Sequence, residues 1–213
     1  MVQIIPAVLA TTEEQYQKDI GKYSSCASLE GSWVHIDFAD NIFVQNQTIG
    51  PEIIEKYPDN FSKEAHLMVL KPKEWIDGLV QAAFKRVIIH IEAEGIQECL
   101  DYAKEKGLEA GLAINNGTTT EKLEPFLDKI TTILIMSIVP GFQGQPFLPQ
   151  ALKKITDIKD QGWSVRVGVD GAVKDDNIKE IVNAGADFVI VGSFLLKGNV
   201  DENLEILWEA ENG

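Results

Sequence analysis

The strongest constraint on the fold is a regular alternation between short apolar runs and longer segments with helical spacing. Eight runs have the length and the β-branched content of strands, at residues 2–9, 33–38, 64–69, 86–92, 109–114, 132–138, 164–169 and 187–191. Segments with helical periodicity lie between them, among them 12–23, 72–83, 96–106, 120–127, 149–161 and 175–184. Because repeated strand-then-helix units imply parallel pairing, this order predicts a parallel α/β fold.

Two architectures contain such units, the (β/α)8 barrel and the open doubly wound sheet. Eight units in 213 residues match a compact barrel with short connections. The open sheet would favour a glycine-rich dinucleotide fingerprint after the first strand, where this sequence reads PAVLA at residues 6–10. Gly107, Gly162 and Gly185 each follow a helical segment, where a left-handed C-cap is expected. We therefore predict a single-domain (β/α)8 TIM barrel over residues 1–213.

Polar side chains interrupt the apolar strands at the ends where a barrel places its active site. His35 and Asp37 alternate with apolar residues and share one face of their strand. Buried polar groups are costly unless they are paired. We call the following four residues the His/Asp cluster: His35, Asp37, His66 and Asp170. Two imidazoles and two carboxylates that converge would bind one divalent metal ion, which could be zinc, iron(II), manganese or cobalt.

Each member of the His/Asp cluster also has an ordinary interpretation. His35 and Asp37 could form a hydrogen-bonded pair, and His66 could be a satisfied core histidine. Asp170 before Gly171 is common turn chemistry. Their shared position at strand ends favours the metal site over four separate coincidences.

Glycine-bearing loops follow the last three predicted strands. The loop at 139–147 contains Gly141, Phe142, Gln143 and Gly144, and the next two strand ends carry Gly171, Ala172, Gly192 and Ser193. Backbone N–H groups in such loops bind anions without a lysine, and barrels often hold phosphate after strands seven and eight. The loops therefore predict a phosphate site, with an ordinary Gly-Pro loop as the alternative.

Other notable residues have structural interpretations. Met68 and Met136, at strand ends, are either core filler or the apolar lining of the pocket. His90 and Glu92 are interpreted as a structural pair near the barrel mouth, and Arg166 as part of an ion pair in the bottom layer. The two cysteines, far apart in sequence, are expected to be reduced thiols.

The net charge of −14 and the lack of a basic run argue against binding to nucleic acid or to an anionic membrane. The first fifteen residues contain neither a positive leader nor a long apolar segment. A cytoplasmic location is therefore the expectation.

The ordered set of motifs resembles the ribulose-phosphate 3-epimerase family over nearly the whole chain. The matching segments are His35-Ile36-Asp37 with Asp40, Phe43-Val44, Gly50-Pro51, His66-Leu67-Met68-Val69, His90-Ile91-Glu92-Ala93, Gly111-Leu112-Ala113, Pro140-Gly141-Phe142-Gln143-Gly144-Gln145, Val169-Asp170-Gly171 and Gly192-Ser193. The resemblance implies a barrel that interconverts D-ribulose 5-phosphate and D-xylulose 5-phosphate by moving a proton at C3. It also implies that the His/Asp cluster binds the metal, that His66 contacts the substrate, and that Asp37 and Asp170 are the acid and the base.

The chemistry requires such an arrangement, because inversion next to a ketone removes a proton from one face of the carbon and returns one to the other. Two carboxyl groups on opposite sides of a planar enediolate can do this. The metal would stabilise the charge on the enediolate oxygens.

The sequence departs from the family pattern at several expected pocket positions. Ala7 stands where the family usually has a serine, Ala39 where it has a methionine, residues 41–42 (Asn-Ile) where it has Gly-His, and Ala172 where it has a second glycine. The hydroxyl missing at Ala7 would cost about 0.5–1.5 kcal/mol of binding. Two alternatives follow, a 3-epimerase of a ketohexose phosphate such as allulose 6-phosphate and a non-catalytic sugar-phosphate binder. The expected partners are a phosphorylated ketose and further copies of the chain in a homo-oligomer.

Overall fold

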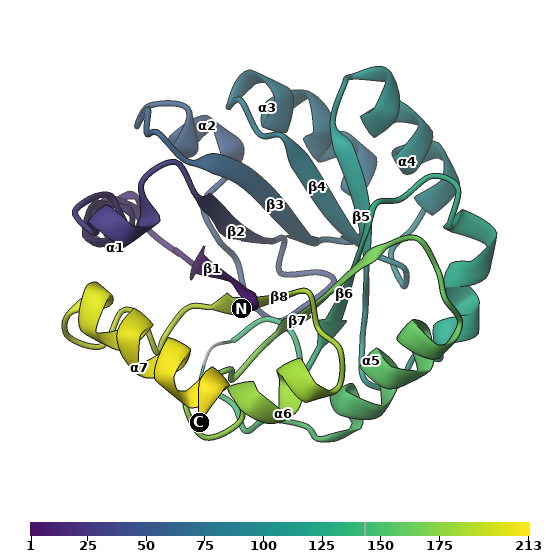
Figure 1. Ribbon diagram of the computed structural model, residues 1–213. Coiled ribbons are helices and arrows are strands. Elements are labelled where there is room, and N and C mark those ends of the chain that lie inside the picture. Colours follow the sequence, from purple (N-terminus) through teal and green to yellow (C-terminus); the bar gives the residue numbers. More distant parts are fainter. Residues whose placement is uncertain (143) are drawn as a thin grey trace.

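The computed structural model describes residues 1–142 and 144–213. Eight parallel strands close into a barrel in sequence order, and helices surround them (Figure 1). The strands are β1 (Gln3–Val8), β2 (Trp33–Ala39), β3 (Ser62–Met68), β4 (Arg86–His90), β5 (Glu109–Ile114), β6 (Thr132–Met136), β7 (Arg166–Asp170) and β8 (Phe188–Val191). The predicted (β/α)8 barrel is confirmed.

The outer layer contains both α-helices and short 3₁₀ segments. The α-helices are α1 (Glu13–Ser24), α2 (Pro51–Ile54), α3 (Ile76–Gln81), α4 (Ile96–Glu105), α5 (Gln150–Asp160), α6 (Ile178–Asn183) and α7 (Val200–Asn212). The 3₁₀ segments are η1 (Ala27–Leu29), η2 (Pro72–Trp75) and η3 (Thr120–Phe126). Within residues 1–142 and 144–213, no helix combines the length and the apolarity needed to cross a bilayer.

The side chains of the strands alternate between the outside and the inside of the barrel, and apolar residues form a core on each side. In β2, Val34, Ile36 and Phe38 belong to the large outer core between strands and helices, so the alternating residues point into the barrel. The inner core consists of Ile5, Ala7, Ile88, Ala113, Leu134, Met136, Phe188 and Ile190. The interior is so tightly filled that a Cβ at Gly168 would lie 2.1 Å from the Phe188 ring. A glycine is therefore required there.

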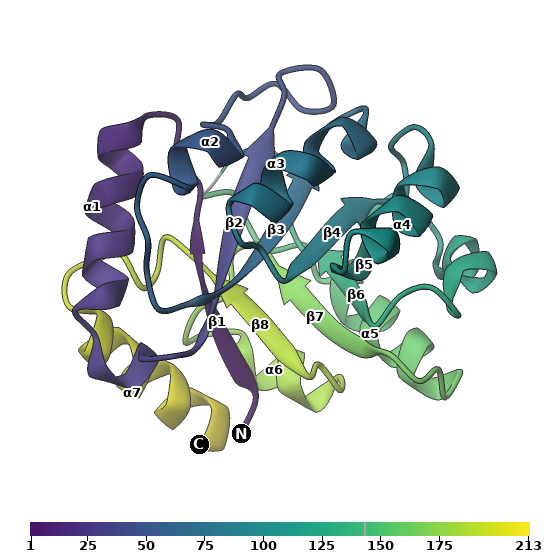
Figure 2. The same ribbon diagram turned by 90° about the horizontal axis from the view of Figure 1, so that it is seen from above.

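The strand register brings distant polar residues to one level. Asp37 of β2 is paired with His66 of β3, and Met136 of β6 with Asp170 of β7. Because all strands are parallel and the barrel is closed, these carboxyl ends surround one mouth. The chain termini lie close to each other (Figures 1 and 2), where the backbone N–H of Val2 donates to Glu211 Oε1 at 2.5 Å.

Local chemistry explains several helix ends. The Thr12 side chain accepts a hydrogen bond from the Gln15 N–H and caps α1. Gly107, Gly162 and Gly185 have positive φ angles of 82°, 66° and 105°, which confirms the predicted left-handed turns after three helices.

Some predicted helices differ from the structure. The segment expected at 120–127 is the 3₁₀ segment η3, because Pro125 inside it cannot donate a backbone hydrogen bond. The segment at 72–83 is divided into η2 and α3. The helices α2 and α7 were not among those expected, although Asn199 caps α7 by accepting from the N–H groups of Asp201 and Glu202.

Candidate active site

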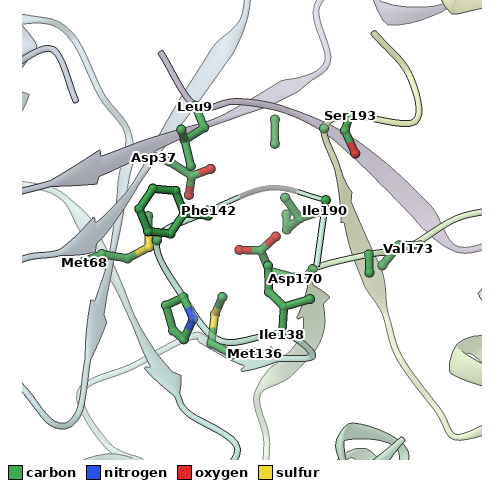
Figure 3. Close-up of a pocket in the computed structure, with 17 residues that line it drawn as sticks. Leu9, Asp37, Met68, Met136, Ile138, Phe142, Asp170, Val173, Ile190 and Ser193 are labelled. Atoms are coloured by element: carbon green, nitrogen blue, oxygen red, sulfur yellow. The ribbon is translucent and has the colours of Figure 1, made fainter. Parts of the chain in front are cut away.

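A cavity opens at the carboxyl ends of the strands. Figure 3 shows the carboxylates of Asp37 and Asp170 inside it, with the two methionines Met68 and Met136 nearby. The residues that line it are Ala7, Leu9, Asp37, Met68, Met136, Ile138, Pro140, Gly141, Phe142, Gly144, Asp170, Gly171, Ala172, Val173, Ile190, Gly192 and Ser193. The lining combines two acidic groups with apolar side chains and glycine backbone.

The His/Asp cluster meets at this cavity. One potential ligand atom from each of its four residues lies within 4.8 Å of all the others. Nδ1 of His66 is 2.9 Å from Oδ1 of Asp37 and 3.5 Å from Oδ2 of Asp170. Nε2 of His35 lies 3.4 Å from the same Asp37 oxygen. The structure therefore brings together all four residues that the sequence singled out.

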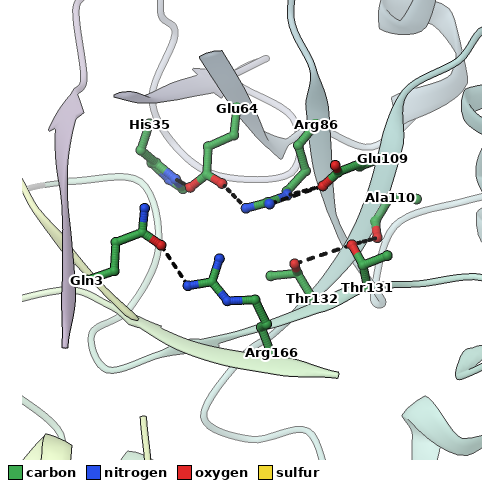
Figure 4. Close-up of polar contacts among 9 residues, drawn as sticks. All are labelled: Gln3, His35, Glu64, Arg86, Glu109, Ala110, Thr131, Thr132 and Arg166. Atoms are coloured by element: carbon green, nitrogen blue, oxygen red, sulfur yellow. Dashed lines mark hydrogen bonds and ion pairs between the residues drawn. The ribbon is translucent and has the colours of Figure 1, made fainter. Parts of the chain in front are cut away.

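His35 is held from below by a chain of charged groups inside the barrel (Figure 4). Its Nδ1 donates to Oε1 of Glu64 at 2.7 Å, and Oε2 of Glu64 accepts from Nη1 of Arg86 at 2.8 Å. Arg86 continues to Glu109 with two bonds of 3.1 and 3.0 Å. Since Nδ1 of His35 is committed to Glu64, its Nε2 is the atom that remains for the cavity.

His66 is held through its other nitrogen. Its Nε2 lies 2.9 Å from Nε2 of His90, and Nδ1 of His90 lies 3.3 Å from Oε2 of Glu92. Burial, the main cause, lowers the pKa of His90 to about 4. Burial alone would raise the pKa of Glu92, but hydrogen bonds from His90 and Thr118 outweigh it and lower that pKa to about 2.

The two carboxylates of the cluster have different proton affinities. Burial and the neighbouring charge of Asp37 raise the pKa of Asp170 to about 6. Burial acts on Asp37 as well, but its contacts with His35 and His66 outweigh it and hold the pKa of Asp37 well below its usual range. A pair with such unequal affinities is suited to acid and base catalysis.

The cluster fits a divalent metal ion. Nε2 of His35 is buried and has no hydrogen-bond partner, as expected of a nitrogen whose partner is a bound ligand. Burial lowers the pKa of His35, but the side chains of Asp37 and Glu64 outweigh this and raise it to about 10. A metal ion would displace the proton that these carboxylates hold on His35.

The predicted phosphate-binding residues lie together, apart from one that cannot be placed. Gly141, Phe142 and Gly144 line the cavity from the β6–α5 loop, and Gly171, Ala172, Gly192 and Ser193 line it from the ends of β7 and β8. Gln143 lies outside the described residues.

Packing fixes two of these loops. The Asn46 amide donates to the Gly141 carbonyl at 2.6 Å, which ties the loop after β2 to the loop after β6. Gly171 has a φ of 118°, and a Cβ there would lie 2.5 Å from Ile138. A side chain at residue 171 would therefore clash with Ile138, and the backbone conformation there also favours glycine.

The positions that depart from the family pattern fall in different places. Ala7 is buried and lines the cavity. Ala39 is buried beside Met68 in the strand register but is not part of the cavity lining. Asn41 and Ala172 both have left-handed backbone, with φ of 58° and 53°, so the Ala172 methyl group sits on a strained backbone next to the predicted phosphate site.

The ion pair predicted for Arg166 was wrong, because its hydrogen-bond partner is the neutral side chain of Gln3. The Arg166 guanidinium donates to Gln3 Oε1 at 2.6 Å (Figure 4). The guanidinium also lies over the Phe188 ring, 5.1 Å from its centroid. Among the described residues, no carboxylate lies within ion-pair distance of Arg166. The interior position itself is as expected.

Glu64, which supports His35 from behind, was not among the residues predicted from the sequence, whereas His90 was predicted as part of a pair with Glu92. Glu64 precedes His66 by two positions, so both point into the barrel from β3. The same alternation that singled out His35 and Asp37 could have identified Glu64. The contact between His66 and His90 depends on the β3–β4 register, which this alternation does not give.

Comparisons with known proteins agree with these motifs. A family model described as the ribulose-phosphate 3 epimerase family matches residues 3–196. A ribulose-phosphate 3-epimerase from Schizosaccharomyces pombe is 32% identical over 212 residues, which cover 96% of this chain and 92% of the relative. The protein of that name from Escherichia coli K12 is 35% identical over 198 residues, which cover 89% of this chain and 87% of the relative. The ribulose-phosphate 3-epimerase from Chlamydia pneumoniae is 38% identical over 177 residues, which cover 78% of this chain and 77% of the relative.

Solved structures share the fold at low sequence identity. The KGPDC protein of Streptococcus mutans aligns with a TM-score of 0.73 at 13% identity, covering 99% of this chain and 97% of the other. The 3-hexulose-6-phosphate synthase of Salmonella typhimurium aligns with a TM-score of 0.69 at 16% identity, with 99% of both chains covered. These likenesses support the barrel architecture alone.

Proposed function

Because the chain belongs to the ribulose-phosphate 3-epimerase family and is a sugar-phosphate 3-epimerase, we propose that it interconverts D-ribulose 5-phosphate and D-xylulose 5-phosphate. The observation that carries this proposal is the pair of carboxylates, Asp37 and Asp170, in one cavity with ligand atoms no more than 4.8 Å apart. The apolar lining around them would keep water away from a reactive carbanion.

In the proposed reaction the two aspartates act on opposite faces of C3. One carboxylate removes the proton next to the ketone, and the other carboxylic acid returns a proton to the opposite face of the planar enediolate. The reverse reaction exchanges the two roles. Burial and the charge of Asp37 raise the pKa of Asp170, whereas at Asp37 burial is outweighed by contacts with His35 and His66, which lower its pKa, so Asp170 takes up a proton more readily than Asp37.

The family and the His/Asp cluster together suggest divalent metal binding. We propose that His35 uses Nε2, His66 uses Nδ1, and the two aspartates use carboxylate oxygens to hold one ion of zinc, iron(II), manganese or cobalt. When bound, the ion would stabilise the negative charge that develops on the substrate oxygens. The unpartnered Nε2 of His35 supports this assignment.

Removal of the metal is expected to lower kcat/KM roughly 100-fold or more, since the stabilisation of developing charge is worth several kcal/mol. Protein dialysed against a chelator would be assayed with a coupled epimerase assay before and after addition of each of the four ions separately. Metal analysis would establish the metal content of every sample. Full activity in protein verified as metal-free would contradict the proposed site.

The phosphate group of the substrate is proposed to bind at the glycine-bearing loops that follow β6, β7 and β8. The residues assigned to it are Gly141, Phe142, Gln143, Gly144, Gly171, Ala172, Gly192 and Ser193. His66, Met68 and Met136 are assigned contacts with the sugar. Backbone amides and a serine hydroxyl suit a phosphate, and the negative net charge of the chain makes such local donors necessary.

Ala7 provides a specific reason to test a second substrate. It lines the cavity and brings no hydroxyl, so it leaves room and removes a hydrogen bond compared with a serine. Turnover would be compared on D-ribulose 5-phosphate and on allulose 6-phosphate. A kcat/KM that is higher for the hexose phosphate would favour the second substrate. Incorporation of solvent deuterium at C3 of either sugar would exclude a non-catalytic binder.

Replacement of Ala172 by Gly is expected to stabilise the protein and to strengthen substrate binding. A left-handed residue with a Cβ costs about 1–2 kcal/mol, part of which the greater unfolded-state entropy of glycine offsets. We expect a net gain of roughly 0.5–1 kcal/mol in the free energy of unfolding, measured by urea denaturation, and a lower KM. Ala83→Gly is the matched control, since Ala83 has a φ of 59° and is exposed outside the cavity. An equal KM change in both variants would contradict the assignment of residue 172 to the phosphate site.

We further propose that residues 1–213 form one epimerase domain, which the family match over residues 3–196 supports. A homo-oligomeric state and a cytoplasmic location stay predictions. Light scattering coupled to size exclusion and cell fractionation would test them.

A further inference from the structure

All three histidines of the chain lie in one contiguous group. The rings of His35 and His66 have centroids 5.1 Å apart, and those of His66 and His90 are stacked at 5.0 Å with an interplanar angle of 23°. Only His35 and His66 belong to the His/Asp cluster. His90 is fully buried behind them, and the proposed function does not use it.

When His66 binds a cation, only one arrangement of protons on His66 and His90 satisfies the hydrogen bond between them. Nδ1 of His66 faces Asp37 and Asp170, whereas its Nε2 lies 2.9 Å from Nε2 of His90. A neutral imidazole has one protonated nitrogen and one lone pair. If Nδ1 of His66 gives its lone pair to the cation, its Nε2 carries the proton, and Nε2 of His90 must accept it.

The proton of His90 is then on Nδ1, which faces Glu92. Oε2 of Glu92 lies 3.3 Å away, and an ionised carboxylate can only accept. The other oxygen of Glu92 is already engaged, because it accepts from the Asn115 N–H at 3.0 Å and from the Thr118 hydroxyl. The Phe43 ring packs on His90 with centroids 4.9 Å apart. Each partner therefore has its orientation fixed by a further contact.

We propose that His90 and Glu92 are positioning residues that fix the tautomer of His66, so that its Nδ1 lone pair points to the metal ion. The series of hydrogen bonds runs from Glu92 through His90 to His66, and neither Glu92 nor His90 contacts the substrate. The inference rests on the metal site of the proposed function. It assigns a role in metal binding to His90 and Glu92, which the sequence indicates only as a structural pair.

The tautomers can be observed directly in the wild-type protein loaded with zinc, a diamagnetic ion. Histidine-selective ¹⁵N labelling gives six ring nitrogens, because the chain has three histidines. We expect His90 to show a protonated Nδ1 and an unprotonated Nε2, and His66 to show a protonated Nε2. A proton on Nε2 of His90, or protons on both of its nitrogens, would overturn the inference.

Zinc affinity, measured by competition with a chromophoric chelator, provides a second test. Loss of a partner behind a metal-bound histidine typically lowers metal affinity roughly 10–100-fold, which is the result expected for His90→Phe. The phenyl ring keeps the packing against Phe43 but accepts no hydrogen bond. His90→Gln should recover most of the affinity, because its amide oxygen can accept from Nε2 of His66. Circular dichroism would establish that each variant is folded.

A double-mutant comparison tests whether Glu92 and His90 act on His66 in series or independently. Glu92→Gln should lower zinc affinity, and in the His90→Phe background it should add nothing, since Glu92 acts only through His90. Glu94→Gln is the matched control, an exposed neighbour in the same loop. Additive losses, or a folded His90→Phe variant with wild-type zinc affinity, would overturn the inference. Epimerase activity in the wild type would leave the proposed function intact in that case, and failure to bind zinc would remove both the inference and the metal site.

Discussion

Asp37→Asn and Asp170→Asn variants are each expected to lose epimerase activity by roughly 10²–10⁴-fold in kcat, the usual contribution of a positioned acid or base. The loss could be larger, because each carboxylate is also a proposed ligand of the metal. Each would be measured by interconversion of the two pentose phosphates and by deuterium uptake at C3 from D₂O. Asp157→Asn is the control, since Asp157 is paired with Lys153 on the surface of α5.

The two variants should also differ in a specific way. With one aspartate left, a proton can be removed from one face of C3 and returned to the same face, so exchange without inversion remains possible. Any residual exchange should therefore occur in one epimer for Asp37→Asn and in the other epimer for Asp170→Asn. Interconversion at the wild-type rate in either variant would contradict the two-carboxylate proposal.

The barrel could be predicted because strand periodicity, turn glycines and chain order agree. The eight runs coincide with the eight observed strands to within a few residues at each end. The helices were less predictable. Residues 120–127 have helical spacing, but Pro125 and a lack of capping favour the 3₁₀ segment. The short α2 has four residues and starts with Pro51, too few for a periodic signal.

The candidate site could be predicted where a polar side chain interrupts an apolar strand. Asp37 and Asp170 come from β2 and β7, and closure of the barrel alone explains why they meet. The partners of Arg166 and His66 could not be predicted in this way, because they depend on side chains from neighbouring strands at a specific register. Sequence alternation gives the face of a strand and leaves open which residue opposes it.

The second large effect is expected at Glu64, which is fully buried and joins His35 to Arg86. Removal of one partner from a buried ion pair costs about 3–5 kcal/mol, because the remaining charge has lost its compensation. Glu64→Leu should therefore lower the free energy of unfolding of the metal-free protein by about 3 kcal/mol in urea denaturation, at the lower end of this range because Arg86 keeps Glu109 as a partner. An unchanged free energy of unfolding would contradict the view that the charged groups around Glu64 stabilise the barrel interior.

Two further variants separate the charge at Glu64 from its shape. Glu64→Leu combined with Arg86→Met should recover much of the lost stability, since replacement of a whole buried pair by apolar residues is often neutral. Glu64→Gln should stay folded but bind zinc more weakly. His35 and Arg86 bond to different oxygens of Glu64, and a glutamine offers an oxygen at only one of these two places. With the amide N–H₂ facing His35, the proton of His35 moves to Nε2, the nitrogen proposed to bind the metal. Unchanged zinc affinity in Glu64→Gln would show that His35 finds its orientation without Glu64.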